Sequence, residues 1–141
     1  MMDRQLFAEK LDSLERHLAR VEEKLPKASA AFKPLTDEAD AVMFHLWLAV
    51  QTTLDLAMSM CAQLHLGTPA DYGDSFVLLR DAGYLPVALA NRLIKAAGFR
   101  NAVAHAYARL DMQRVYRAAK DGPKDLRAFF LAMGKAAKLE R

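Results

Sequence analysis

Residues 37–66 read DEADAVMFHLWLAVQTTLDLAMSMCAQLHL, a run dominated by Leu, Met, Val, Phe and Ala with Trp47 among them. An apolar run of this length is longer than a strand and is typical of a buried helix. The side-chain oxygen of Thr36 or Asp37 can cap its first amides, and Gly67, Thr68 and Pro69 stop it. We predict that this is the central and most buried helix of the protein.

Polar residues within this helix are grouped rather than scattered. At about 100° per residue, one sector of about 120° contains the following six residues: His45, Gln51, Thr52, Asp55, Ser59 and Gln63. Phe44 and Leu48 interrupt the sector. Two interpretations remain open: a stripe that faces solvent, or a polar cleft lined by Asp55 and its neighbours.

The flanking sequence also predicts helices. Residues 1–26 form an N-terminal helix that Pro26 ends, and its apolar seam favours packing in an antiparallel bundle over donation to a partner. After a short connection at 27–34 and the central helix, we expect helices at 71–81, about 87–107, 111–120 and 124–138, with Asp121-Gly122-Pro123 separating the last two. No segment alternates with period two between hairpin turns, so the fold class is all-α.

Length and composition agree with one globular domain over residues 1–141, with a helical core at 37–139. The chain is 53% hydrophobic and 26% charged, with 6 Gly and 5 Pro, which excludes a disordered or low-complexity protein. Cys61 is the one cysteine, so no internal disulfide is possible. We expect a cytoplasmic protein without a membrane span, because no signal-peptide pattern is present and the apolar run at 41–50 is too short to cross a bilayer.

Basic charge is concentrated in the C-terminal part. The net charge is +3, yet residues 86–141 contain 12 Lys or Arg against 4 Asp or Glu, a sum of +8. Such a surface favours a polyanion such as nucleic acid. Soluble helices with Lys and Arg facing outward are an equally plain explanation.

The most specific pattern lies at residues 98–107, GFRNAVAHAY, which reads R-N-x-x-x-H-x-Y. At the residue frequencies of this chain, the four fixed positions arise by chance roughly once in ten thousand. With the motif at 100–107, the chain resembles the HEPN superfamily, and specifically the HepT-like toxins of HEPN/MNT toxin–antitoxin systems, which carry R-x4-H-x-Y. The resemblance extends from about Asp40 to Met133 and includes Gln51 and Asp55.

This resemblance implies a HEPN-type up-and-down helical bundle that acts as a homodimer. It further implies the toxin of a type VII system: a metal-independent ribonuclease that needs no cofactor and acts on tRNA or mRNA. Arg100 and His105 would be catalytic at the dimer cleft, and Asn101 would support RNA binding. The partner would be an MNT-type nucleotidyltransferase antitoxin, which silences the toxin by AMPylation of Tyr107.

The residue chemistry is compatible with those roles. An imidazole exchanges protons near neutral pH, and a guanidinium binds a phosphate through two hydrogen bonds. On a helix, however, Arg100 and His105 point about 140° apart, whereas Asn101 shares a face with His105 and Arg100 with Tyr107. Two motifs facing each other across a two-fold axis would bring Arg100 of one subunit near His105 of the other.

Two alternatives from other classes remain. The protein could be a catalytically silent helical partner of a nucleotidyltransferase, or an RNA-binding module without turnover, for which the basic C-terminal part would be the whole explanation. A metal-dependent nuclease is disfavoured, because the four acidic residues of the central region have no ligand-like spacing near His105. They are Asp55, Asp71, Asp74 and Asp81.

Overall fold

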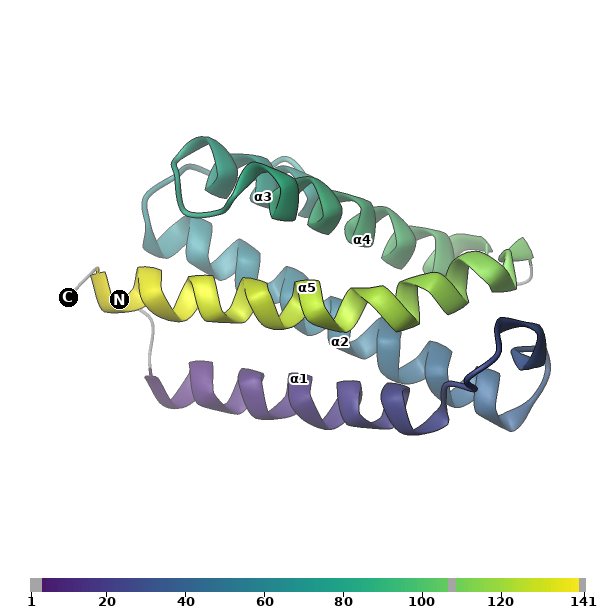
Figure 1. Cartoon of the computed structure of the whole chain (residues 1–141). Helices are drawn as coiled ribbons and strands as arrows, with labels where there is room; N and C mark the ends of the chain where they lie inside the picture. The colour runs from purple at the N-terminus through teal and green to yellow at the C-terminus, as the bar shows by residue number, and fades with distance from the viewer. Residues whose placement is uncertain (1–3, 107–108, 140–141) are drawn as a thin grey trace.

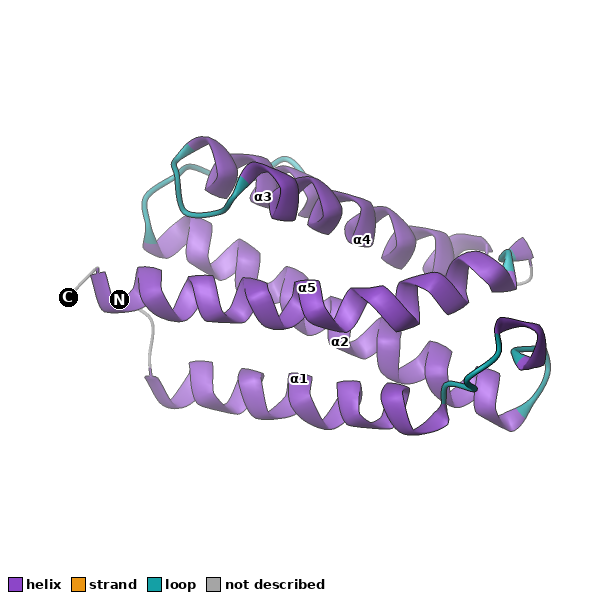
Figure 2. Cartoon of the chain, in the orientation of Figure 1, coloured by secondary structure: helices purple, strands orange, loops and turns teal. Residues whose placement is uncertain are grey.

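The computed structural model describes residues 4–106 and 109–139, which form five α-helices and one short 3-10 turn. The helices are α1 (Arg4–Lys24), α2 (Asp37–Gln63), α3 (Tyr72–Asp81), α4 (Val87–Ala106) and α5 (Met112–Leu139), and the turn is η1 (Ser29–Ala31). Figure 2 shows helices joined by loops and no strand in this described part of the chain. The all-α prediction is confirmed.

The helices run up and down around α2. α1 and α2 are antiparallel, α3 and α4 form a second antiparallel pair, and α5 returns along the bundle (Figure 1). α2 packs against each of the other four helices. It is therefore the central helix that its composition predicts.

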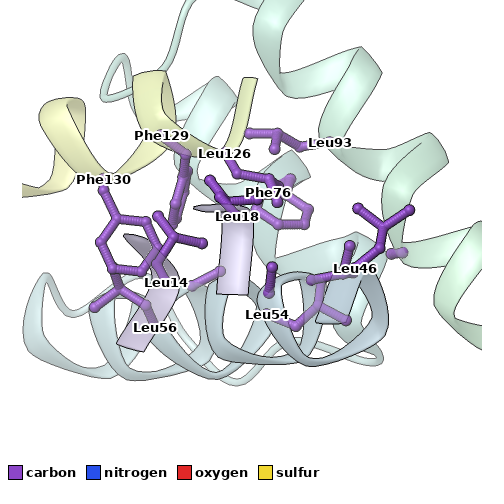
Figure 3. Close-up of a cluster of buried hydrophobic side chains, with 14 of the residues drawn as sticks. Leu14, Leu18, Leu46, Leu54, Leu56, Phe76, Leu93, Leu126, Phe129 and Phe130 are labelled. Carbon is purple, nitrogen blue, oxygen red and sulfur yellow. The ribbon is translucent and has the colours of Figure 1, made fainter. Parts of the chain in front are cut away.

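The core lies where α1, α2 and α5 converge, with α3 and α4 closing it from one side (Figure 3). Its largest fully buried side chains come from all five helices: Leu14, Leu18, Leu46, Leu54, Leu56, Met60, Phe76, Leu79, Leu93, Leu126, Phe129 and Phe130. Full burial of each such side chain contributes about 1.5–3 kcal/mol. The buried residues of α1 are Leu14, Leu18 and Val21, so the seam of the N-terminal helix packs inside its own bundle.

The ends of α2 follow from local chemistry. The Thr36 hydroxyl accepts a hydrogen bond from the Ala39 amide at 3.1 Å, which is the predicted cap. α2 ends at Gln63, three residues earlier than the predicted 66, because His65 adopts a left-handed φ of 58° and Gly67 one of 95°.

α2 is long and apolar enough to cross a membrane by length and composition alone, since its most apolar 18-residue window has a mean hydropathy of 1.3. α2 is therefore a longer candidate span than the apolar run at 41–50, which by itself is too short to cross a bilayer. Half of that window is buried inside the bundle, and the core helix of a soluble protein passes the same test.

The prediction of two separate C-terminal helices is wrong. α5 continues through Asp121-Gly122-Pro123, and Pro123 is buried inside it. A proline in a helix removes one backbone hydrogen bond. Here the apolar stripe keeps a helical phase on both sides of the proline, from Val115 and Ala119 to Leu126 and the residues beyond. Burial of that unbroken stripe offsets the lost hydrogen bond.

One basic residue of the C-terminal part serves the fold. Arg127 on α5 donates hydrogen bonds to Glu15 and Glu22 on α1 at 2.9–3.2 Å. These bonds lower the pKa of Glu22 and raise the pKa of Arg127. The charge of Arg127 is therefore neutralised within the bundle.

Two histidines far apart in the sequence meet between α1 and α2. Nδ1 of His17 lies 2.9 Å from Nδ1 of His45, and both rings are partly buried. Desolvation lowers the pKa of each ring below 6.5, with smaller contributions from Arg16 at His17, and from His17 and Arg20 at His45. One neutral ring donates its N–H to the bare nitrogen of the other, an arrangement that protonation of both rings would break.

We expect the free energy of unfolding to fall as the pH drops below 6.5. Because both pKa values are lowered by folding, the unfolded chain binds more protons in that range. Urea unfolding between pH 5 and 8 should show a shallower acid slope in His17→Gln than in the wild type. His65→Asn, at an exposed left-handed position, is the control that should keep the wild-type slope. Equal slopes in all three proteins would contradict this account.

Candidate active site

The side chain of Arg100 is held in a fixed position between α4 and α2. It is half-buried, and its Nε donates a hydrogen bond to Oε1 of Gln51 at 2.9 Å. Its Nη1 donates to Oδ1 of the neighbouring Asn101 at 3.2 Å. Arg100 is thus anchored by a residue 49 positions away and by the next residue on its own helix.

Two aromatic rings flank the guanidinium. Its central carbon lies 5.6 Å from the centroid of Trp47 on α2 and 5.4 Å from that of Tyr72 at the start of α3. Both distances are within the range of cation–π attraction, about 6 Å. The rings restrict the sideways movement of the guanidinium.

Gln51 is itself oriented by its neighbours. Its Nε2 donates to Oδ1 of Asp55 at 2.9 Å and to the hydroxyl of Tyr72 at 3.3 Å. A carboxylate accepts hydrogen bonds and does not donate them, so Asp55 fixes the amide nitrogen on its own side. The amide oxygen of Gln51 is thereby directed at Arg100.

The anchored guanidinium retains donors. It has five N–H groups, and the two bonds above use one at Nε and one at Nη1. Among the described residues, no hydrogen bond or ion pair involves Nη2. An anion with the geometry of a phosphate could accept from these remaining groups.

The other motif residues lie along the same helix. Asn101 and His105 are both exposed, and His105 is in the last turn of α4. The structure brings Arg100 and Asn101 together, whereas the helical angle separates His105 from Arg100 by about 140°. Tyr107 lies outside the described residues.

The polar sector of α2 serves several purposes. Gln51 is half-buried against Arg100, and Asp55 remains exposed at the rim. Thr52 donates a hydrogen bond to the carbonyl of Leu48, and His45 is hydrogen-bonded to His17. The sector is therefore neither a uniform solvent-facing stripe nor a cleft: Gln51 and Asp55 form a hydrogen-bonded chain to Arg100, and Thr52 and His45 have separate partners.

Trp47 and Tyr72 lie outside the sequence motif, and their contact with Arg100 was not predicted. A partial signal was available, because Trp47, Gln51 and Asp55 are spaced by four residues and so share one face of α2. No local sequence pattern predicts that Tyr72 contacts Arg100, because the position of Tyr72 depends on how α3 folds back onto α4. Within the described residues, no group of three or more His, Cys, Asp or Glu side chains could hold a metal ion.

A helical bundle with an R-N-x-x-x-H pattern on its fourth helix defines a HEPN-type protein, and comparison with protein families agrees. The model for the ribonuclease HepT-like family matches residues 14–133. The chain therefore belongs to the HepT-like ribonuclease family. A curated relative, the mRNA nuclease HepT of Shewanella oneidensis, is 26% identical over 124 residues, covering 88% of this chain and 92% of the relative.

Solved structures share the fold. The tri-AMPylated HEPN toxin of Shewanella oneidensis, in complex with MNT antitoxin, matches with a TM-score of 0.85 at 24% identity, over 95% of this chain and 99% of that chain. YutE of Bacillus subtilis, a cytosolic protein of unknown function, matches with a TM-score of 0.82 at 20% identity, over 98% of this chain and 92% of that chain. The HEPN-type bundle predicted from the sequence is confirmed.

We expect Gln51→Leu to free the Arg100 guanidinium without unfolding the bundle. A hydrogen bond to a charged group contributes about 1.5 kcal/mol, so solvent exchange of the Arg100 Nε–H should become roughly tenfold faster. Arginine Nε–H resonances in nitrogen-15 NMR spectra measure this rate. The control is Gln63→Leu, the same change about 18 Å further along α2. An unchanged Arg100 signal in Gln51→Leu would show that Gln51 does not hold the guanidinium.

Proposed function

We propose that this protein is the toxin of a type VII HEPN/MNT toxin–antitoxin system and acts as a metal-independent ribonuclease. The observation that carries the proposal is the anchored Arg100, which keeps unused donors on the helix that also bears His105. Family membership and the mRNA nuclease relative support RNA as substrate, with mRNA ahead of tRNA. The YutE match supports a cytoplasmic location.

Arg100 binds and stabilises the reacting phosphate. As a nucleophile adds to phosphorus, negative charge grows on the non-bridging oxygens, and a donor that is already positioned stabilises this charge without reorganising. Gln51, Asn101 and the two flanking rings provide that positioning. Asn101, exposed beside Arg100, adds a polar contact to the RNA backbone.

His105 moves the proton. Its neutral imidazole removes the proton from the ribose 2′-hydroxyl, whose oxygen then forms a bond to the adjacent phosphorus while the bond to the 5′-oxygen of the next nucleotide breaks. The imidazolium or a water molecule returns a proton to that leaving oxygen, and a 2′,3′-cyclic phosphate remains. The nucleophile belongs to the RNA itself, so the step needs no metal hydroxide and cannot proceed on DNA.

The separation of Arg100 and His105 around α4 supports a homodimeric site. Beside Arg100, the surface of α2 and α4 is mostly apolar: Phe44 is 58% exposed and lines a shallow groove with Met43, Trp47 and Val103, and Asp40 is the acidic residue of its lining. Exposed aromatic surface of this kind suits a contact between two copies of the chain. Arg100 would then meet His105 of the partner subunit.

Tyr107 is the proposed point of control by an MNT nucleotidyltransferase. Its hydroxyl oxygen would attack the α-phosphate of ATP, giving a tyrosyl–AMP bond and releasing pyrophosphate and a proton. Each AMP adds bulk and a negative phosphate close to a site built for an RNA phosphate, which repels and blocks substrate. The AMPylated HEPN toxin among the structural matches supports this assignment.

Replacement of either motif residue should abolish most cleavage. In buffer with EDTA, His105→Ala should lower the rate roughly 10²–10⁴-fold through loss of the proton carrier, and Arg100→Ala comparably. The control is His65→Ala, which should cleave RNA and arrest growth like the wild type. Binding without cleavage in the wild type would favour the RNA-binding module, and neither activity would favour the silent partner.

Mixing the two inactive variants tests the composite site. The Arg100→Ala and His105→Ala chains are mixed, unfolded and refolded together, so that mixed dimers form. If Arg100 of one subunit acts with His105 of the other, this mixture should recover about one quarter of the wild-type rate. Half of the dimers are mixed, and each mixed dimer contains one intact site. No recovery in a mixture that sediments as dimers would rule out the shared site.

We expect Tyr107→Phe to escape neutralisation. Phenylalanine lacks the hydroxyl that receives AMP, so cells with this variant should stop growing even with an MNT nucleotidyltransferase that silences the wild type. Colony counts and the mass of the purified toxin measure the effect. Tyr84→Phe should be silenced normally, and full rescue of the Tyr107→Phe strain would contradict the assignment.

A further inference from the structure

A large groove runs between α4 and α5 on a part of α4 that Arg100 does not occupy. Its volume is about 870 Å³, within the range of about 300–1,000 Å³ typical of small-molecule sites. Ala102 lines it, three residues before His105, so the groove reaches within one helical turn of that imidazole. Figure 1 shows α4 and α5 leading side by side to this end of the bundle.

The floor of the groove is apolar and includes one aromatic ring. Its lining includes Leu46 and Val50 from α2, Leu93 and Phe99 from α4, and Val115 and Leu126 from α5. Phe99 is half-buried, whereas Leu46 and Val50 of α2 are buried, with 2% and 3% of their surface exposed. A flat aromatic face over an apolar floor is the surface on which an unpaired nucleobase stacks.

The rim of the groove is cationic at the end near His105. Arg109 and Arg114 line that end, Lys95 lies on the rim one turn of α4 beyond Arg92, and none of the three forms an ion pair with another described residue. Asp111 also lines this end and accepts a hydrogen bond from the Gln113 amide as a helix cap, and with Arg109 and Arg114 beside it the end keeps a net positive charge. These cations can therefore meet phosphates.

The opposite end carries both signs of charge. Nε of Arg92 donates to both carboxylate oxygens of Asp125 at 3.0 and 3.1 Å, which joins α4 to α5 and neutralises both groups. Asp121 also lies on this groove, on the same face of α5 as Asp125. The charge along the groove is thus asymmetric, positive toward His105 and balanced away from it.

We infer that this groove binds one nucleotide of a single-stranded RNA substrate, next to the phosphate that is cut. The base stacks on Phe99 above the apolar floor, and the flanking phosphates contact Lys95, Arg109 and Arg114. This inference rests on the proposed ribonuclease function and extends it: the substrate would be unpaired RNA, held by stacking and by backbone charge. A base enclosed in a duplex could not enter the groove.

The test compares residues of equal charge on and off the groove. Arg114→Glu lies on its rim, and Arg117→Glu makes the same charge change one turn further along α5, outside its lining. Both residues are exposed, so neither variant should unfold the protein. The probe is a short single-stranded 2′-O-methyl oligonucleotide, which cannot be cut because its nucleophile is blocked, with 2-aminopurine at each position in turn.

We expect Arg114→Glu to weaken binding of the probe about tenfold and Arg117→Glu about twofold or less. On RNA, Arg114→Glu should raise KM by a similar factor with little change in kcat, because Arg114 would contact a flanking phosphate and not the phosphate that is cut. One 2-aminopurine position should be quenched on binding, and Phe99→Leu should remove that quenching while the protein stays folded by circular dichroism.

Equal weakening by Arg114→Glu and Arg117→Glu, or quenching that survives Phe99→Leu, would overturn the inference and leave the proposed function intact. The same would follow if Arg114→Glu dissociated the dimer or prevented antitoxin binding without altering probe affinity, because the occupant would then be a protein. A wild type that binds the probe in the groove but cuts no RNA would instead overturn the proposed function alone.

Discussion

Burial of the apolar side of α2 by the other four helices is the constraint from which the rest of the structure follows. A helix this apolar must be covered, and four other helices pack around it to do so. A half-buried polar group on such a helix needs a partner, since an unpaired one is costly. Gln51 meets this requirement with Asp55, Tyr72 and Arg100. The hydrogen bonds that Gln51 needs as a half-buried polar group on α2 therefore also orient the guanidinium of Arg100.

The geometry of α4 links chemistry to assembly. Side chains five positions apart on one helix point about 140° apart. The anchored Arg100 and the exposed His105 of one subunit therefore face different directions. In the proposed dimer, each is half of a site. The exposed Phe44 beside them offers apolar surface to a second copy, and the groove toward α5 offers a place for the RNA strand. In this proposal, dimerisation and substrate binding use adjacent sides of one helix.

The apolar periodicity of the sequence predicted the buried faces of the helices correctly. Residues that disfavour a helix were a less reliable guide to where a helix ends. The apolar runs predicted six helices, of which the first four match α1 to α4 and the last two are one continuous helix, and Thr36 caps α2 as expected. Asp121-Gly122-Pro123 looked like a break because each residue disfavours a helix by itself. The apolar stripe, however, stays in phase from Val115 to Met133, and that continuity outweighed the local preferences. Reading the phase across the proline would have corrected the prediction.

The sequence by itself determined the helical class, the central place of α2 and the motif residues on α4, because periodicity and motif spacing are properties of the linear chain. Tertiary structure alone decided what surrounds the motif. Tyr72 and Trp47 reach Arg100, and His17 meets His45, through contacts between separate helices. Such contacts depend on how helices rotate and pack against one another, and no local pattern encodes that rotation.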